Sequence, residues 1–265
     1  MWKLLYAILL LLIFLVWKDR TSQEFFTPHS RIAPGRLGVA SYNIQYLPYM
    51  RKDLTKLKSI LLRYPIILLQ ECFNRLTTLP LSEIFPDYYI CRGILQGAAL
   101  VNSGLVILSQ YPILSYEFTP FSKTNFFTTD VLSNKGFLSA EIQLPDKRIR
   151  VVNAHLQSSD YTDYDPIVKD QLAQIMRYTD SLKVPYIIGG DFNIDYRQLE
   201  YSNIHAPSAP TIYSNLKNAK TSSSQKAGYQ PFTFDYFFVK GLTPSGPVKT
   251  YTSSFSDHNP IFLLL

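Results

Sequence analysis

Short apolar runs with interspersed polar positions, bounded by Gly, Pro, Asn and Asp, occupy most of the chain after residue 36. Runs of this kind, rich in β-branched and aromatic residues, are typical of β-strands. They predict strands at residues 39–47, 66–71, 105–108, 136–144, 149–157, 186–189, 234–239 and 260–265. Turn residues at 145–147 join two of these segments, which are therefore expected to form a hairpin.

Two segments between the strands have the periodicity of amphipathic helices. In residues 51–63, apolar side chains recur every three or four positions, and Lys and Arg fill the opposite face. Residues 165–182 have the same periodicity and begin with Asp165 and Pro166, a typical N-cap and first-turn proline. Residues 203–230, rich in Ser, Ala and Lys, are expected to be a surface loop. The mixture predicts one α/β domain of packed sheets flanked by helices.

The first residues of the chain form an apolar segment. Residues 4–17 are uncharged and have a lysine and a tryptophan at each end, which suit the two interfaces of a bilayer. At about 1.5 Å per residue the segment would span about 21 Å, which is short for a bilayer crossing. Residues 14–17 contain no small residue to mark a cleavage site. We therefore expect residues 1–20 to be a membrane anchor or a signal, retained rather than cleaved.

Residues 21–36, punctuated by Pro and Gly, are expected to be a linker, with the domain beginning near Leu37. An anchor would leave the domain on the cytoplasmic side by the positive-inside count, whereas a signal would export it. The sequence leaves both locations open.

Charge and cysteine content change this picture only a little. The 26 basic and 20 acidic residues give a formal net charge of +6, a mild preference for anionic partners. Dense basic stripes typical of a dedicated nucleic-acid binder are missing. Cys72 and Cys91 provide neither a disulfide framework nor a metal-ligand spacing, so they are expected to be buried, with one optional bridge.

Polar residues directly follow, or interrupt, five of the apolar runs. They lie in segments 41–43, 69–71, 153–157, 189–193 and 256–260. Loops converge at strand ends, and burying a carboxylate, amide or imidazole costs several kcal/mol unless a metal, partner or ligand satisfies it. We therefore expect these residues to share one cleft.

The ordered motifs SYNIQ, LQE, SGLVILSQYP, NAHLQ, GGDFN, FDYFFV and SDHNP, which run from Ser41 to Pro260, resemble the endonuclease/exonuclease/phosphatase superfamily. That superfamily includes deoxyribonuclease I, abasic-site endonucleases, inositol polyphosphate phosphatases and neutral sphingomyelinases. Each motif alone is weak, but the whole series in order is specific. The resemblance implies a deoxyribonuclease I-like four-layer α/β sandwich, two packed mixed sheets flanked by helices. It also implies Mg²⁺-dependent cleavage of a phosphate ester, with Mn²⁺ or Ca²⁺ as other candidate ions.

The same resemblance implies the metal ligands. Glu71 is the principal ligand, Asn43 lies beside it, and Asp257 is a further ligand or belongs to a second site. Hard oxygen donors of this kind suit Mg²⁺, which takes few ligands from protein and leaves the rest to water and phosphate. Each residue has a structural alternative: Glu71 could pair with an arginine, Asn43 could be a turn residue, and Asp257 could cap a loop.

The catalytic roles also follow from the resemblance. His155 contacts the phosphate and acts as the acid, and His258 lies opposite, its tautomer fixed by Asp235. Asp191 either accepts the proton from water or stabilises the imidazolium, so the general base stays open between Asp191 and His258. Asn193 donates its amide to a phosphate oxygen.

Smaller signals favour one branch of the superfamily. Residues 134–137 and 155–158 resemble neutral sphingomyelinases more than abasic-site endonucleases, which makes Lys135 a candidate for binding the phosphate or head group. Asn102, a second candidate for binding the substrate, lies where nucleases of the deoxyribonuclease I type have an acidic partner for the first histidine, and this weakens the nuclease hypothesis. The aromatic cluster in residues 116–127 either contacts a bilayer interface or packs beneath a loop.

These observations predict a monomeric, membrane-associated or exported phosphodiesterase whose catalytic domain is residues 37–265. A phospholipid substrate of the sphingomyelinase C type is favoured over nucleic acid. The alternatives are a deoxyribonuclease I-like or abasic-site nuclease, an inositol phosphate phosphatase and an inactive binding module.

Overall fold

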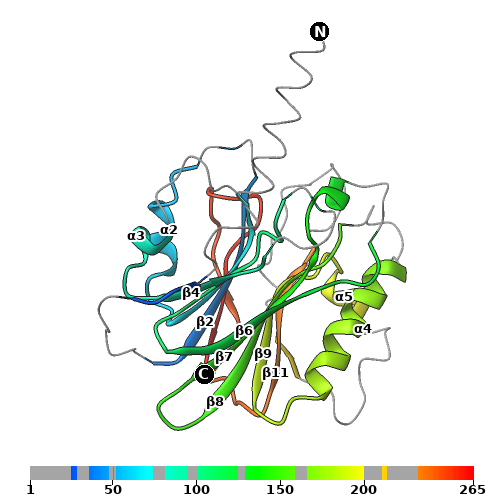
Figure 1. The fold of residues 1–265 in the computed structure, drawn as a ribbon. Helices are drawn as coiled ribbons and strands as arrows, with labels where there is room; N and C mark the ends of the chain where they lie inside the picture. The colour runs from blue at the N-terminus through cyan, green and yellow to red at the C-terminus, as the bar shows by residue number, and fades with distance from the viewer. Residues whose placement is uncertain are drawn as a thin grey trace.

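Two mixed β-sheets pack face to face in the computed structural model, with helices on their outer sides (Figure 1). The structure describes residues 25–28, 36–47, 50, 52–73, 81–94, 99, 101–124, 129–158, 166–199, 211–213 and 232–265. One sheet has the order β1 (Phe25–Phe26), β4 (Tyr89–Arg92), β5 (Val106–Ser109), β3 (Ile66–Cys72), β2 (Gly38–Tyr46), β13 (Ile261–Leu264) and β12 (Lys249–Thr250). The other has the order β10 (Thr211–Tyr213), β11 (Asp235–Lys240), β9 (Tyr186–Asp191), β8 (Arg148–His155), β7 (Gly136–Gln143) and β6 (Ile113–Pro120).

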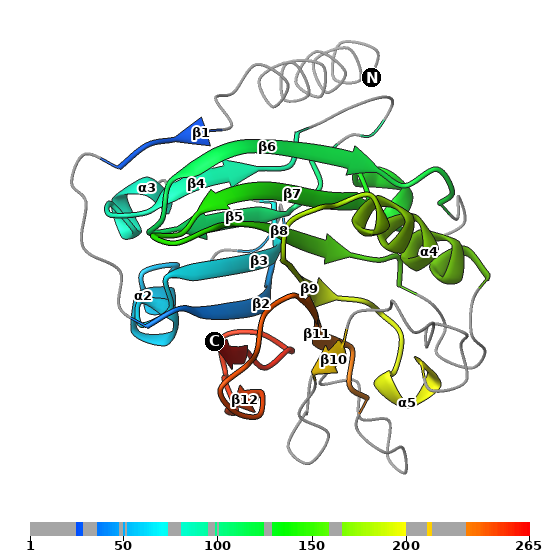
Figure 2. The same cartoon turned by 90° about the horizontal axis from the view of Figure 1, so that it is seen from below.

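The helices form the two outer layers. Helices α2 (Lys56–Leu61) and α3 (Leu81–Ile84) cover the seven-stranded sheet, and α4 (Pro166–Asp180) and α5 (Tyr196–Leu199) lie beyond the six-stranded sheet (Figure 2). A 3-10 turn, η1 (Thr129–Leu132), precedes β7.

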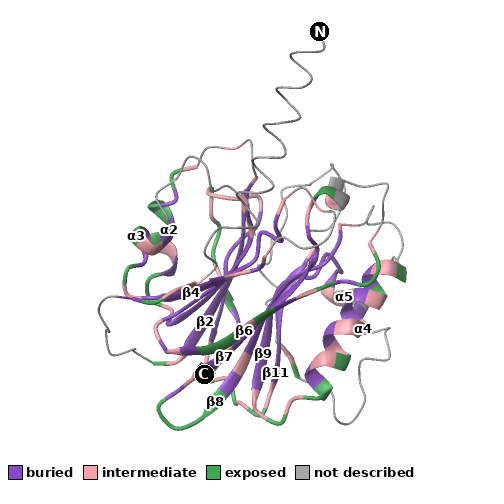
Figure 3. Cartoon of the chain, viewed as in Figure 1, coloured by how far each residue is buried: buried purple, intermediate pink, exposed green. Residues whose placement is uncertain are grey.

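Three apolar clusters hold these layers together. One lies between the sheets and includes Leu68 of β3 and Val151 of β8. A second joins Leu57 of α2 to the seven-stranded sheet, and a third joins Leu172 of α4 to the six-stranded sheet. The central strands are consequently buried on both faces (Figure 3). The predicted four-layer α/β sandwich is confirmed.

The chain direction of the central strands determines where polar residues can gather. Strands β2 and β3 are parallel, as are β8 and β9, and these two pairs face each other across the interior. The carboxyl ends of two parallel strands lie at the same edge of a sheet. Four strand ends therefore meet at one end of the sandwich.

Several elements differ from the sequence expectation. Strands β4 and β6 were not predicted, and β6 is an edge strand with a register shift between Ile113 and Ser115. That shift removes the period-two pattern on which the prediction depends. Helix α2 begins at Lys56, five residues later than predicted for residues 51–63. Helix α4 begins at Pro166, as expected, and Asp165 lies outside the described residues.

The predicted linker and surface loop both contribute short strands. Within residues 21–36, β1 pairs antiparallel with β4, so the sheet extends into the segment expected to be a linker. Within residues 203–230, β10 pairs with β11. The predicted anchor or signal, residues 1–20, lies outside the described residues. In the part of the chain that the structure does describe, no helix is long and apolar enough to cross a membrane.

The aromatic segment at residues 116–127 lies partly in β6. Phe118 and Phe121 are buried, so these two side chains pack in the protein interior and do not contact a bilayer. Phe126 and Phe127 lie outside the described residues.

The two cysteines are buried, and no disulfide joins them. Cys72 belongs to the cluster beneath α2, whereas Cys91 belongs to the cluster between the sheets, so the two side chains lie on opposite faces of one sheet. Strand β5 also separates their strands. Two strand spacings are about 9.6 Å, beyond the reach of a disulfide. The prediction of an optional disulfide bridge between Cys72 and Cys91 is therefore wrong.

Gly190 is the tightest backbone position in the six-stranded sheet. Its φ is 151°, and a Cβ there would lie 1.9 Å from the carbonyl oxygen of Ala154 in β8. We expect Gly190→Ala to lower the free energy of unfolding by about 3 kcal/mol, because backbone must move to relieve the clash. Urea unfolding would measure this, with Gly246→Ala as the matched control, since nothing lies within 4 Å of a Cβ at Gly246. Equal midpoints for the two variants would contradict the expectation.

Candidate active site

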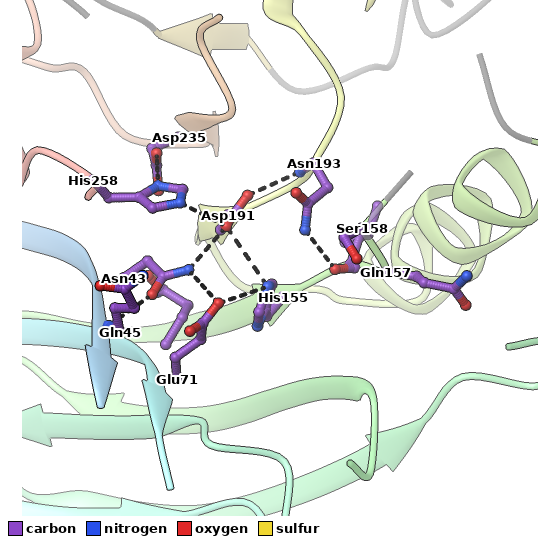
Figure 4. A network of polar contacts seen from close by, with 12 residues as sticks. Asn43, Gln45, Glu71, His155, Gln157, Ser158, Asp191, Asn193, Asp235 and His258 are labelled. Atoms are coloured by element: carbon purple, nitrogen blue, oxygen red, sulfur yellow. Dashed lines mark hydrogen bonds and ion pairs between the residues drawn. The ribbon is translucent and has the colours of Figure 1, made fainter. Parts of the chain in front are cut away.

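Alternation along the inner strand faces brings the predicted residues together. In β8, Val151 lies in the apolar layer between the sheets, and His155 lies four residues further on the same face, at the strand end. In β9, Ile187 and Asp191 have the same relation. Figure 4 shows the resulting cluster, to which both sheets contribute.

Strand β2 after Asn43 and strand β9 after Asp191 have the same local structure. The side-chain oxygen of Asn43 accepts a hydrogen bond from the backbone N–H of Gln45 (3.0 Å), and Oδ1 of Asp191 accepts one from the N–H of Asn193 (2.9 Å). Gln45 and Asn193 both have positive φ, 46° and 49°. The turn shifts the register of β2 and follows the end of β9, and in both places it holds the first side chain in one orientation.

Glu71 reaches the site by a different route. Its φ is 53°, and together with Gln45 and Asn193 it completes the set of positive-φ non-glycine residues in the described chain. The left-handed conformation interrupts the alternation of β3, so that Gln70 and Glu71 both face the other sheet while Cys72 returns to the outer cluster. Each such residue costs about 1 kcal/mol or more, and all three lie at the site.

Asp191 is the centre of the cluster. Its Oδ2 accepts a hydrogen bond from Nδ2 of Asn43 (3.0 Å) and lies 3.6 Å from Nε2 of His155 and 3.5 Å from Nε2 of His258. Both imidazoles therefore face one carboxylate oxygen.

Glu71 shares the same amide. Its Oε1 accepts from Nδ2 of Asn43 (3.0 Å) and lies 3.8 Å from Nε2 of His155. Burial raises the pKa of Glu71, and Asp191 adds to the effect, against the hydrogen bond from Asn43 and the charge of Lys135. Two carboxylates thus converge on a single hydrogen-bond donor, at a position where positive charge would be stabilised.

Hard oxygen atoms from Glu71 and Asp191 fit a divalent cation such as Mg²⁺. Another group in the described residues, Asp191, Asp235 and His258, also has ligand atoms within 4.8 Å of one another. Because His258 is already hydrogen-bonded to Asp235 and imidazole suits Zn²⁺ or Cu²⁺ better than Mg²⁺, the carboxylate oxygens provide the better Mg²⁺ site.

The other two predicted ligands occupy less direct positions. Asn43 uses its oxygen for the N–H of Gln45, so its nitrogen faces the carboxylates, and ligation through oxygen would require the amide to rotate. Asp257 lies on the loop before β13, where Oδ2 accepts from Nε2 of Gln45 (3.0 Å) and Oδ1 from the hydroxyl of Ser256 (3.2 Å). The ligand roles of Asn43 and Asp257 stay predictions.

His258 and Asp235 form a buried pair. Nδ1 of His258 lies 2.8 Å from Oδ2 of Asp235, which fixes the ring and leaves Nε2 facing Asp191. Burial alone would lower the pKa of His258, but the carboxylates of Asp235 and Asp191 outweigh it and raise the pKa. The second oxygen of Asp235 is buried without a hydrogen-bond partner.

His155 has the opposite electrostatics. Burial lowers its pKa well below the ordinary value, and the charges of Lys135 and His258 lower it further. Nζ of Lys135 lies 3.2 Å from Nε2 and 3.4 Å from Nδ1 of the ring. The imidazole is therefore neutral at pH 7 in this arrangement.

Lys135 itself is held by Asp130, which the sequence did not indicate, and by the backbone of a recognised motif. Its Nζ donates to the carbonyl of Leu156 (3.2 Å) and pairs with Oδ1 of Asp130 (3.2 Å). Oδ2 of Asp130 accepts from both the N–H and the hydroxyl of Ser158, at 2.8 and 2.9 Å. Asp130 lies in η1, outside every recognised motif, so no sequence signal identified it.

The remaining two predicted residues have structural contacts. Nδ2 of Asn193 donates to the carbonyl of Leu156 (2.9 Å). Oδ1 of Asn102 accepts from the N–H of Gly104 (2.9 Å), in the turn before β5. Binding of a phosphate by Asn193 and of substrate by Asn102 stays a prediction.

The sequence is similar to those of known proteins. A sphingomyelinase C of Leptospira interrogans is 26% identical over 203 residues, which cover 64% of this chain and 36% of that protein. The chain thus spans about a third of the length of that relative.

Solved structures share the fold. The crystal structure of beta toxin from Staphylococcus aureus with bound magnesium ions matches with a TM-score of 0.64 at 20% identity, covering 87% of this chain and 99% of that one. D. rerio TDP2 complexed with a single-strand DNA product matches with a TM-score of 0.62 at 15% identity, covering 86% and 98%. The model of the Endonuclease/Exonuclease/phosphatase family matches residues 40–258, and this chain belongs to that family.

Proposed function

We propose that this protein is a divalent-metal-dependent phosphodiesterase that cleaves the head group from a phospholipid, a reaction of the sphingomyelinase C type. The observation that carries the proposal is the convergence of Glu71, Asp191, His155 and His258 from both sheets on one buried cluster. Nothing in core packing requires two carboxylates and two imidazoles with carboxylate oxygens and ring nitrogens 3.5 to 3.8 Å apart, and burying them costs stability.

In this proposal Glu71 holds the cation, with Asp257 and Asn43 as further ligands. When bound, the cation would stabilise negative charge on the phosphate and acidify a water molecule. Mg²⁺ is the expected ion because the donors are oxygens. The beta toxin structure with bound magnesium ions has the same fold, which supports the choice without deciding it.

The protein's own groups handle the protons. Asp191 accepts the proton of the attacking water, and the protonated ring of His258, whose Nε2 lies 3.5 Å away and whose Nδ1 is held by Asp235, orients that carboxylate. The water oxygen bonds to phosphorus as the bond from phosphorus to the alcohol oxygen breaks. The products are the alcohol and the phosphorylated head group.

His155 and Lys135 face the other side of the cluster. A neutral imidazole donates a hydrogen bond to the phosphate, and the negative charge of the phosphate would raise the pKa of His155 toward the range of a general acid. In the complex the ring takes up a second proton from solvent, and the resulting imidazolium supplies a proton to the leaving oxygen and returns to the neutral form. Lys135 contributes a fixed positive charge beside the ring.

The similarity to a sphingomyelinase C supports a lipid substrate over DNA. Residues 1–20 would bring the domain to a membrane or export it. A nuclease is the second candidate because TDP2, which was solved with a DNA product, has the same fold.

The test is a substrate panel on the full chain. Vesicles of labelled sphingomyelin or phosphatidylcholine, plasmid DNA, an abasic-site duplex and inositol polyphosphates would be incubated with Mg²⁺, Mn²⁺, Ca²⁺ or EDTA. We expect head-group release from vesicles with Mg²⁺ and none with EDTA. Cleavage of DNA without lipid would favour a nuclease, and release of inorganic phosphate without lipid cleavage would favour an inositol phosphate phosphatase. Complete inactivity would favour a binding module.

Lys52 offers a prediction about the loop that carries Asp257 and His258. Its Nζ donates to the carbonyls of Ile44 (2.9 Å) and Phe255 (2.8 Å), so it ties that loop to the end of β2. We expect Lys52→Met to lower kcat for lipid cleavage by about tenfold or more, since small displacements of catalytic groups are costly.

Steady-state kinetics would measure this, with Lys56→Met as the control because Lys56 is an exposed lysine of α2. The positioning role would be wrong if both lysine variants kept the parent's kcat.

A further inference from the structure

A pair of amides lies between the apolar layer and the site. Gln70 of β3 and Asn153 of β8 are fully buried and belong to different sheets. The preceding inward positions on the same strands are Leu68 and Val151, both in the apolar cluster between the sheets. The amides thus interrupt a layer that apolar residues fill elsewhere.

The hydrogen bonds of this pair cross from one sheet to the other. Nδ2 of Asn153 donates to the carbonyls of Leu69 (2.8 Å) and Val106 (2.9 Å), on β3 and β5. Oδ1 of Asn153 accepts from Nε2 of Gln70 (2.7 Å), whose other hydrogen goes to the hydroxyl of Ser41 (3.1 Å).

These contacts fix both amide orientations. Nδ2 of Asn153 must face the two carbonyls, so its oxygen must face Gln70, and Gln70 must present its nitrogen. One atom is left over, because Oε1 of Gln70 is buried without a hydrogen-bond partner. An unsatisfied buried acceptor is unfavourable for folding. Stability alone therefore does not account for the pair, since apolar residues of similar volume would fill the same space.

Each member of the network lies beside a site residue on its own strand. Gln70 directly precedes Glu71, and Asn153 lies two residues before His155. Apolar contacts between sheets are non-directional and permit small offsets, whereas hydrogen bonds of 2.7 to 3.1 Å do not. The network therefore sets the position of the end of β3 relative to the end of β8.

We propose that Gln70 and Asn153 are positioning residues, whose hydrogen bonds between the sheets hold Glu71 against His155 and Asp191 in the geometry that binds the cation and phosphate. This inference rests on the proposed function for its kinetic consequence, and its consequence for metal binding can be measured separately. Neither residue touches the reacting groups in this proposal.

The double variant Gln70→Met/Asn153→Leu tests it, because it removes both polar partners at similar volume. We expect the urea midpoint to fall, because the carbonyls of Leu69 and Val106 lose the amide of Asn153. The dissociation constant for Mn²⁺ measured by calorimetry should rise about tenfold, and kcat should fall about a hundredfold. KM for vesicles should stay within about threefold. If the double variant does not fold, Gln70→Met alone is used, since it leaves the bonds of Asn153 to the two carbonyls in place.

The matched controls are Leu68→Ala and Val151→Ala, which lie one inward position deeper on the same strands and are equally buried. They should lower the urea midpoint more than the double variant does. Their kcat and Mn²⁺ affinity should stay within about twofold of the parent. The proposal would be overturned if the double variant kept the parent's Mn²⁺ affinity and kcat. It would also be overturned if the two controls lost as much Mn²⁺ affinity and kcat as the double variant does.

Failure of the proposed function gives a different result. A parent protein that binds Mn²⁺ but cleaves none of the substrates would refute the phosphodiesterase, and the Mn²⁺ titrations would still decide the positioning role. An active parent with an equally active double variant would refute only the positioning role.

Discussion

Asp191→Asn is expected to lower kcat for head-group release by about a thousandfold, with little change in KM for vesicles. The carboxylate faces Nε2 of both His155 and His258, at 3.6 and 3.5 Å, so its charge acts on both imidazoles. An asparagine keeps the volume and removes this charge. Its nitrogen would also meet either the Nδ2 donor of Asn43 or the backbone donor of Asn193, and neither position accepts a second donor.

Release of the labelled head group from sphingomyelin vesicles, sampled over time, would measure the fall in kcat. Circular dichroism and urea unfolding would verify the fold. Asp146→Asn is the control for loss of one carboxylate, because Asp146 is an exposed residue that pairs with Lys147 in the turn between β7 and β8. Activity within tenfold of the parent in Asp191→Asn would remove Asp191 from the proton pathway and leave His258 as the base.

The part of the site that follows from strand alternation was predictable from the sequence. His155 and Asp191 lie at the ends of their strands and Asn43 lies near the end of β2, all on the face between the sheets, so the period-two pattern already placed them together. Glu71 does not follow the pattern, since its left-handed backbone puts it on the same side as Gln70. Its position was inferred from the family motif, and the alternation alone would have directed it outward.

Contacts between distant segments were the part that could not be predicted. The ion pair of Lys135 with Asp130 depends on how η1 folds back beside β7, and Asp130 carries no local signal. The amide orientation of Asn43 depends on the N–H of Gln45, which in turn depends on a turn geometry. The separation of Cys72 and Cys91 depends on which strands pair, and spacing along the chain does not give strand order.

The two halves of the site therefore have different origins. Strand directions in the sandwich bring the carboxylates and imidazoles together, whereas turns with positive φ and the amides of Gln70 and Asn153 set their final orientation. A substitution of a charged group should change the chemistry at constant fold, and a substitution of an orienting group should change metal affinity and kcat together.

Glu71→Gln provides the sharpest test of the metal assignment. We expect the Mg²⁺ concentration for half-maximal activity to rise about a hundredfold, because the principal anionic ligand becomes neutral. In the metal-free protein the substitution should not lower stability. Burial raises the pKa of Glu71, so folding disfavours its charged form above that pKa, and a neutral glutamine is free of this penalty.

Thermal unfolding with and without Mg²⁺ separates these effects. The parent should gain stability with Mg²⁺ in proportion to the logarithm of the concentration above the dissociation constant, and Glu71→Gln should gain almost none at the same concentrations. Glu83→Gln, at an exposed position of α3, should behave as the parent. If Glu71→Gln kept the full stabilisation by Mg²⁺, the cation would have to be bound elsewhere, and the oxygens of Asp191 and Asp235 beside His258 would become the site to test.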